Sequence, residues 1–136
     1  MLLVLEIDLY SSLAQILLTE GMTETLRKSR AKKVYICNAM TKHGETNNFT
    51  VLDFTNEIEK YLGCELDYVI YNSFLPQKER IKNYKKEHPE LLELVKFDQK
   101  LLKDKKFIGR NLLPSSGTIT HDTNKLTKVI LGLCKL

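Results

Sequence analysis

Residues 33–63 read KVYICNAMTKHGETNNFTVLDFTNEIEKYLG, and this stretch decides the fold. It begins with a short apolar, β-branched run at residues 34–37, of the kind that is buried on both faces of a parallel sheet. A polar loop runs from Asn38 to Asn48, and an amphipathic helix follows it. A buried strand followed by a loop and a helix predicts an α/β fold with parallel strands.

The predicted helix carries signals at both ends. Thr50 can cap its first turn, and Asp53 three residues later can bond back to the cap, which makes a capping box. Gly63 stands where a left-handed C-terminal cap belongs. The residues expected on the buried face are Phe54, Ile58, Tyr61 and Leu62.

The polar loop is the best candidate for a site, because ligands of open α/β sheets bind beyond the carboxyl ends of the strands. It combines amide, hydroxyl and carboxylate groups from Asn38, Thr41, Glu45, Thr46 and Asn47. That mixture suits the hydroxyls of a sugar or ribose, or a phosphate bridged by a metal. The same residue types also satisfy turns and caps without any ligand, and the pattern leaves both interpretations open.

Glu45 is the one acid in the loop before the capping box. It could bind Mg²⁺ through water or bond to a pair of hydroxyls, or it could pair with Lys42. No other metal ligand set is predicted, and His43 is expected to have no role.

The rest of the chain continues the alternation of strands and helices. A strand at residues 2–7, a helical segment broken at Gly21 and the strand at 34–37 predict a βαβ unit. The strand at 66–71 ends at Asn72, whose amide would face the same rim as Asn38. We then expect a polar helix from Pro76 to His88, a third strand at 91–97, a turn at 101–102, a strand-like segment at 107–113, a turn at 114–117 and a last helix after His121 and Asp122.

Composition sets the class of protein. The 136 residues, 43% hydrophobic and 28% charged, suit a single globular domain and exclude a disordered chain. The excess positive charge of +4 lies entirely in residues 78–106, which hold ten basic and six acidic residues. A helix face exposed to solvent explains this cluster of basic residues. Nucleic acid is an unlikely partner, because Tyr84 alone interleaves with these basic residues. Three isolated cysteines and the lack of a membrane-spanning run predict a cytoplasmic protein with reduced thiols.

The loop also carries a family resemblance. Its pattern Cys-Asn-x-Met-Thr-x-x-Gly-Glu-Thr, at residues 37–46 and followed by an Asp-containing helix, resembles the signature of the YvcK-like gluconeogenesis factors. These belong to the superfamily of CofD, the 2-phospho-L-lactate transferase. Similar segments continue outside the loop: DLYSSLAQILLTEGMTETLRKSRAKKVYICN at 8–38, ELDYVIYN at 65–72 and ITHDTNKLTKVIL at 119–131.

The resemblance implies the C-terminal part of a CofD-like fold, a mostly parallel sheet in a Rossmann-like three-layer arrangement. It implies a regulatory factor that links central carbon metabolism with the cell envelope and binds a nucleotide sugar such as UDP-N-acetylglucosamine. The implied ligand-binding residues are Asn38, Thr41, Gly44, Glu45, Thr46, Asn47 and Asn72. Secondary candidates are Asp8, Tyr10, Ser11, Asp53 and His121. A phosphate of the ligand could face the N-terminus of the helix that Thr50 caps.

Two alternatives remain open at this stage. The first is an enzyme that, like CofD, moves a phospholactyl group from a nucleotide diphosphate donor to a deazaflavin acceptor, with Mg²⁺ neutralising the phosphates. No catalytic residue is assigned for it. The second is an inactive structural fragment.

The sequence also departs from the family pattern. Leu5-Glu6-Ile7 stands where relatives carry Gly-Pro-Gly, Thr120 replaces an arginine, and Asn47-Asn48 replaces Asp-Gly. The glycine-rich loop of the relatives' N-terminal part has no counterpart here. We therefore expect the chain to be the C-terminal portion of a longer protein, completed by self-association or by a missing N-terminal half.

Overall fold

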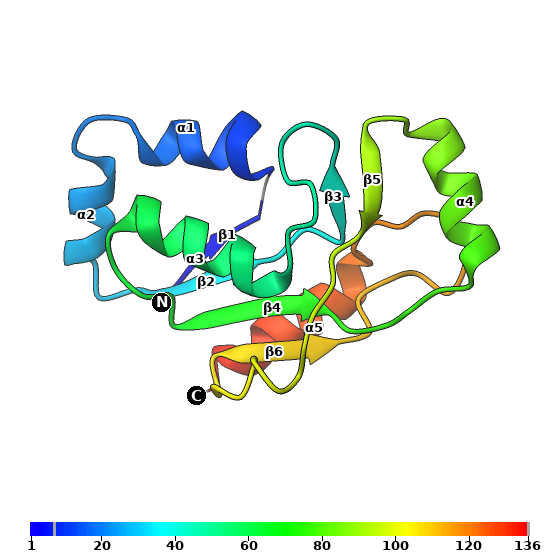
Figure 1. Ribbon diagram of the computed structural model, residues 1–136. Helices are drawn as coiled ribbons and strands as arrows, with labels where there is room; N and C mark the ends of the chain where they lie inside the picture. The colour runs from blue at the N-terminus through cyan, green and yellow to red at the C-terminus, as the bar shows by residue number, and fades with distance from the viewer. Residues whose placement is uncertain (7, 136) are drawn as a thin grey trace.

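The computed structural model describes residues 1–6 and 8–135 (Figure 1). In chain order its elements are β1 (Leu2–Leu5), η1 (Leu9–Leu13), α1 (Ala14–Leu17), α2 (Met22–Lys28), β2 (Lys32–Ile36), β3 (Met40–Lys42), α3 (Val51–Leu62), β4 (Tyr68–Asn72), α4 (Lys78–Glu87), β5 (Leu91–Leu94), β6 (Phe107–Arg110) and α5 (Thr123–Leu133).

The main sheet has four strands in the order β1-β2-β4-β6. All three neighbouring pairs are parallel, with Val34 opposite both Val4 and Tyr68. β1 and β2 are joined through η1, α1 and α2, so the predicted βαβ unit is present. The prediction of a mostly parallel α/β sheet flanked by helices is confirmed.

Helices cover both faces of this sheet. On one face, η1, α1 and α3 bury a core that includes Leu9, Leu13, Phe54 and Ile58. On the other face, Val34 and the strand residues beside it pack against α5 (Figure 1). The strands at the centre are therefore apolar on both sides, as their sequence indicates.

The local signals around α3 form as predicted. The Thr50 side chain accepts a bond from the Asp53 amide, and the Asp53 side chain accepts one from the Thr50 amide, which completes the capping box. Gly63 caps the other end with a left-handed backbone. Asn48 also has a positive φ of 62°, a conformation that asparagine tolerates better than most residues.

The strand predicted at residues 91–97 is present, but it is not parallel and does not belong to the main sheet. It forms β5, shorter than expected, and pairs antiparallel with β3 in a separate two-stranded sheet. β3 itself lies inside the stretch expected to be loop. The fourth strand of the main sheet is β6, from the segment at 107–113. A strand that carries Glu93, with Lys96 two residues beyond its end, is poorly suited to burial between two helical layers, which explains why β5 lies outside them.

The remaining elements lie close to their predicted positions. α4 begins at Lys78 with Gln77 as its N-cap, two residues after Pro76. The β1 prediction extended to Ile7, which lies outside the described residues. None of the described helices is both long and apolar enough to cross a lipid bilayer.

Candidate functional site

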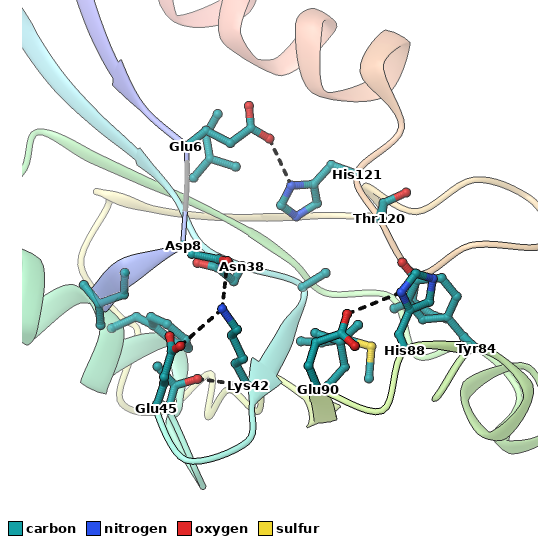
Figure 2. A pocket seen from close by; sticks show the side chains of 18 residues that line it. Glu6, Asp8, Asn38, Lys42, Glu45, Tyr84, His88, Glu90, Thr120 and His121 are labelled. Carbon is teal, nitrogen blue, oxygen red and sulfur yellow. Dashed lines mark hydrogen bonds and ion pairs between the residues drawn. The ribbon is translucent and has the colours of Figure 1, made fainter. Parts of the chain in front are cut away.

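A pocket of about 440 Å³ opens where β1 and β2 end (Figure 2). Its floor comes from the start of η1 and the end of β2. One side comes from the paired strands β3 and β5 with α4 behind them, and another side comes from the segment before α5. The polar and charged side chains that line it are Glu6, Asp8, Asn38, Lys42, Glu45, Thr46, Tyr84, His88, Glu90, Thr120 and His121.

Asp8 connects several of these groups. It occupies the N-cap position of η1, yet its side chain makes no cap bond. The carboxylate instead accepts hydrogen bonds from Asn38 Nδ2 at 3.2 Å and from Lys42 Nζ at 3.4 Å. Leu13 donates its amide to the Asp8 carbonyl five residues back, so the chain enters η1 as a π-helix, a form often found at functional sites.

Lys42 lies between two carboxylates. Its ammonium is 3.2 Å from Glu45 Oε1 and 3.4 Å from Asp8 Oδ2. The hydrogen bond to Glu45 is the main reason that the pKa of Lys42 is raised. The Lys42 amide donates to Thr46 Oγ1 at 2.8 Å, which fixes the turn that returns Glu45 to the pocket.

Asn38 follows β2 and is held by side chains on both sides. Its Oδ1 accepts a bond from the Tyr35 hydroxyl at 3.2 Å, and its Nδ2 donates to Asp8. Burial raises the pKa of Tyr35, so this phenol stays protonated and remains a donor. The neighbouring Cys37 thiol is fully buried, and that burial raises its pKa, which excludes it as a nucleophile.

Two histidine–carboxylate pairs also line the pocket. His121 Nδ1 lies 3.3 Å from Glu6 Oε1, and His88 Nδ1 lies 3.4 Å from Glu90 Oε1. The Tyr84 ring packs on His88 with ring centroids 4.3 Å apart. Figure 2 shows both pairs at the pocket, with the Glu6–His121 pair above Asp8 and the His88–Glu90 pair to the right of Lys42.

The pocket is acidic. Among the described residues that line it, the carboxylates of Glu6, Asp8, Glu45 and Glu90 outnumber one lysine. Within the described part of the chain, no three His, Cys, Asp or Glu residues are grouped so that they could hold a metal ion. Glu45, the residue predicted to bind Mg²⁺ through water, pairs with Lys42 at 3.2 Å.

The structure brings five of the predicted site residues into the pocket. They are Asn38, Glu45 and Thr46 from the loop, and Asp8 and His121 from the secondary candidates. Their convergence joins a segment before η1, the loop after β2 and the segment before α5.

Three other predicted residues have structural roles beside the pocket. The Thr41 hydroxyl is buried and bonds to the main chain of Glu93 at 3.2 Å, which joins β3 to β5. Asn47 Oδ1 accepts the Gly44 amide at 2.8 Å and so closes the loop on itself.

Asn72 does not reach the pocket. Its Nδ2 donates to the Phe74 carbonyl at 2.8 Å, and its Oδ1 accepts the amides of Phe74 and Leu112. The expectation that Asn38 and Asn72 would share one rim is therefore not met, because main-chain groups bond to both the oxygen and the nitrogen of the Asn72 amide.

The last three candidates also point elsewhere. The Tyr10 hydroxyl donates to Glu57 at 3.0 Å, and Ser11 makes a long 3.4 Å bond to Asp8. Asp53 accepts from the Thr50 amide and hydroxyl at 2.8 and 2.7 Å. Its carboxylate thus occupies the N-terminus of α3 and disfavours a phosphate there.

Several residues that line the pocket were not among the predicted site residues. Glu6 was visible as an acid at a glycine position of the family pattern, and Lys42 as a partner for Glu45. Tyr84, His88 and Glu90 carry no local signal, because they reach the pocket only through the pairing of β5 with β3.

Comparisons with known proteins identify the family of this chain. The family model described as 2-phospho-L-lactate transferase CofD matches residues 8–112. The gluconeogenesis factor of Bacillus subtilis is 31% identical over 94% of this chain and 41% of its own length. A relative from Thermotoga maritima is 36% identical over 90% of the chain and 40% of its own length.

A crystal structure of a UPF0052 family protein from Bacillus halodurans superposes with a TM-score of 0.79 at 27% identity, covering 94% of this chain and 42% of that one. The chain thus spans about two fifths of the length of each of these three proteins. It belongs to the family described as 2-phospho-L-lactate transferase CofD, among relatives that include a gluconeogenesis factor.

Proposed function

We propose that this chain binds a nucleotide sugar and acts as part of a regulatory factor of the gluconeogenesis-factor type. The observation that carries the proposal is the pocket at the ends of β1 and β2, where amide, hydroxyl, carboxylate and imidazole groups converge. Its volume of about 440 Å³ lies in the range of small-molecule sites.

The negative charge of the pocket favours entry of the sugar part of the ligand over its diphosphate. Carboxylates such as Asp8 and Glu45 accept hydrogen bonds from hydroxyls, whereas they repel phosphate oxygens. Lys42 offers little attraction to a phosphate, because both of these carboxylates already neutralise it. The diphosphate would then lie at the rim, where Mg²⁺ brought with the ligand could screen it.

The apolar part of the lining supports the same assignment. Leu9, Ile36 and Phe54 line the pocket beside the polar groups. A sugar ring has one edge of hydroxyls and faces of C–H groups, so it needs both kinds of contact. The regulatory role itself rests on the names of the relatives.

A phospholactyl transferase of the CofD type is the second candidate, favoured by the family model. Its donor carries several phosphates, and an acidic pocket would need Mg²⁺ to admit them. Turnover of a phospholactyl-nucleotide donor with a deazaflavin acceptor would favour this candidate over the first.

The proposal also includes a partner, either a second copy of the chain or a separate polypeptide that resembles the part of the relatives' length that this chain does not match. β1 is an edge strand of the main sheet; its residue Val4 and the preceding Met1 are exposed. Unpaired edges of this kind accept further strands. Light scattering of the isolated chain would distinguish a monomer from a self-associated form.

A thermal-shift titration tests ligand binding. The ligands are UDP-N-acetylglucosamine, UDP, GDP, GTP and NAD, each with and without Mg²⁺. At about 100 times its dissociation constant, a ligand adds roughly 2.7 kcal/mol to the free energy of unfolding, which corresponds to several degrees in melting temperature. We expect the largest shift with UDP-N-acetylglucosamine.

Variants then place the site. Glu45→Gln should reduce the shift, and Glu20→Gln, a matched change at an exposed glutamate outside the pocket, should leave it unchanged. Cooperative melting without a shift from any nucleotide sugar would contradict the proposal and would leave an inactive structural fragment.

A further inference from the structure

His121 Nε2 is a buried polar atom with no hydrogen-bond partner among the described residues. The side chain is only 11% exposed, and it lines the pocket. Figure 2 shows its ring projecting from the segment before α5 into the space next to Glu6 and Asn38. A buried nitrogen without a partner costs stability, so it needs an explanation.

The other ring nitrogen does have a partner. His121 Nδ1 lies 3.3 Å from Glu6 Oε1. An ionised carboxylate can only accept hydrogen bonds, so in the neutral ring this contact places the proton on Nδ1. Nε2 then carries a lone pair and can act only as an acceptor.

We propose that His121 is a ligand-binding residue whose Nε2 accepts a hydrogen bond from a neutral donor of the ligand, a hydroxyl or an amide N–H. Glu6 is its positioning residue, because it fixes the tautomer. The inference rests on the proposed function and adds the chemical class of the group that the pocket selects. In the ligand-free chain Nε2 is shielded, so ligand binding has to expose this nitrogen.

This arrangement discriminates between the two parts of a nucleotide sugar. Sugar hydroxyls and the N–H of an acetamido group donate hydrogen bonds, and so they match Nε2. Ionised phosphate oxygens only accept, and so they do not. Thr120, beside His121, bonds through its hydroxyl to Thr118 at 3.0 Å and adds no positive charge. Thr120 therefore adds nothing to phosphate recognition.

Nitrogen NMR of the full chain labelled with ¹⁵N-histidine tests both residues. The chain has three histidines, and single variants assign their resonances. We expect His121 to show the Nδ1–H tautomer. N-acetylglucosamine and UDP-N-acetylglucosamine should both move its Nε2 resonance, and UDP alone should not. Glu6→Gln, which keeps the side-chain size, should abolish the tautomer preference.

Calorimetric titration gives the matching affinities. His121→Ala should weaken N-acetylglucosamine binding about tenfold or more, as expected for a lost hydrogen bond to a buried group. His43→Ala is the matched control, an exposed histidine outside the pocket, and it should bind as the parent chain does. Cooperative melting of each variant confirms that it is folded.

The outcomes separate this inference from the proposed function. If UDP-N-acetylglucosamine binds but leaves Nε2 unmoved, or His121→Ala binds equally well, the inference is wrong and the proposed function stands. If N-acetylglucosamine binds through His121 but UDP adds nothing, the inference stands and the nucleotide part fails. If neither sugar binds, both are wrong. A His121 ring with the proton on Nε2 would overturn the role of Glu6.

Discussion

The carboxyl edge of the sheet has an open half and a closed half. Asn38 follows β2 and Asn72 ends β4, the neighbouring parallel strand. Asn38 is held by two side chains, Tyr35 and Asp8, at 3.2 Å each, and it lines the pocket. Asn72 is held by main-chain groups of Phe74 and Leu112, and it does not line the pocket.

The difference teaches that the residue type does not decide the role. A side-chain partner can rotate away, and a ligand can then take over its hydrogen bond. A main-chain partner can move away only if the chain unfolds locally. The open half at β1 and β2 can therefore bind, and the closed half at β4 and β6 holds the strands together.

The largest effect on stability is expected when a fully buried leucine is truncated. Each half of the sheet edge has one such leucine, Leu9 in the open half and Leu112 in the closed half. Leu112→Ala should lower the free energy of unfolding by about 2–5 kcal/mol, because it leaves a closed cavity. Leu9→Ala should lie at the lower end of that range, because Leu9 lines the pocket and the vacated space joins an existing opening. Chemical denaturation measures both. An equal or greater cost for Leu9→Ala would contradict the distinction.

Asn72→Ala comes next. It removes the acceptor of the Leu112 amide, so the free energy of unfolding should fall by about 1–3 kcal/mol. Ligand binding by the folded variant should be unchanged, since Asn72 does not line the pocket. Urea unfolding and the thermal-shift titration check the two halves of this prediction.

Asn38→Ala should have the opposite pattern, a small loss of stability and a large loss of ligand binding. Its stability cost should be smaller, about 0.5–1.5 kcal/mol, because water in the pocket can take the place of the amide. The thermal shift caused by UDP-N-acetylglucosamine should be lost. If Asn38→Ala costs as much stability as Asn72→Ala and still binds the sugar, the two halves do not differ in the way described.

The smallest effect concerns Tyr10, a predicted site residue that lies outside the pocket. Burial, and then its bond to Glu57, raise the pKa of Tyr10 to about 12. The folded chain thus holds this proton more tightly than the unfolded chain, whose tyrosine titrates near pH 10. The stability that it contributes is complete below pH 10 and is lost between about pH 10 and 12.

The measurement compares the parent chain with Tyr10→Phe by urea unfolding from pH 8 to 11.5. The stability advantage of the parent should shrink as the pH rises above 10. An advantage that is constant over this range would show that the Tyr10 proton is not linked to folding.

Features set by near neighbours were predictable from the sequence. The Thr50–Asp53 box and the Gly63 cap each depend on a few consecutive residues, and each is present. The parallel sheet followed from the alternation of apolar strands and helices.

Features set by distant pairing were not predictable. The apolar residues at 91–97 indicated a strand but not its partner, and the charges at Glu93 and Lys96 were the available signal against a central place. Without the pairing of β5 with β3, Tyr84, His88 and Glu90 could not be assigned to the pocket. The same reasoning explains Asn72, whose amide is taken by a main-chain group 40 residues away.

The separate β3–β5 sheet has a consequence for changing what the chain recognises. β3 and β5 pair with each other and not with the four parallel strands, yet Met40, Lys42 and Leu91 from these strands line the pocket. Substitutions on this small sheet would therefore alter one side of the pocket and leave the parallel core intact. Libraries directed at ligand preference would best vary this sheet and keep the strands beneath it.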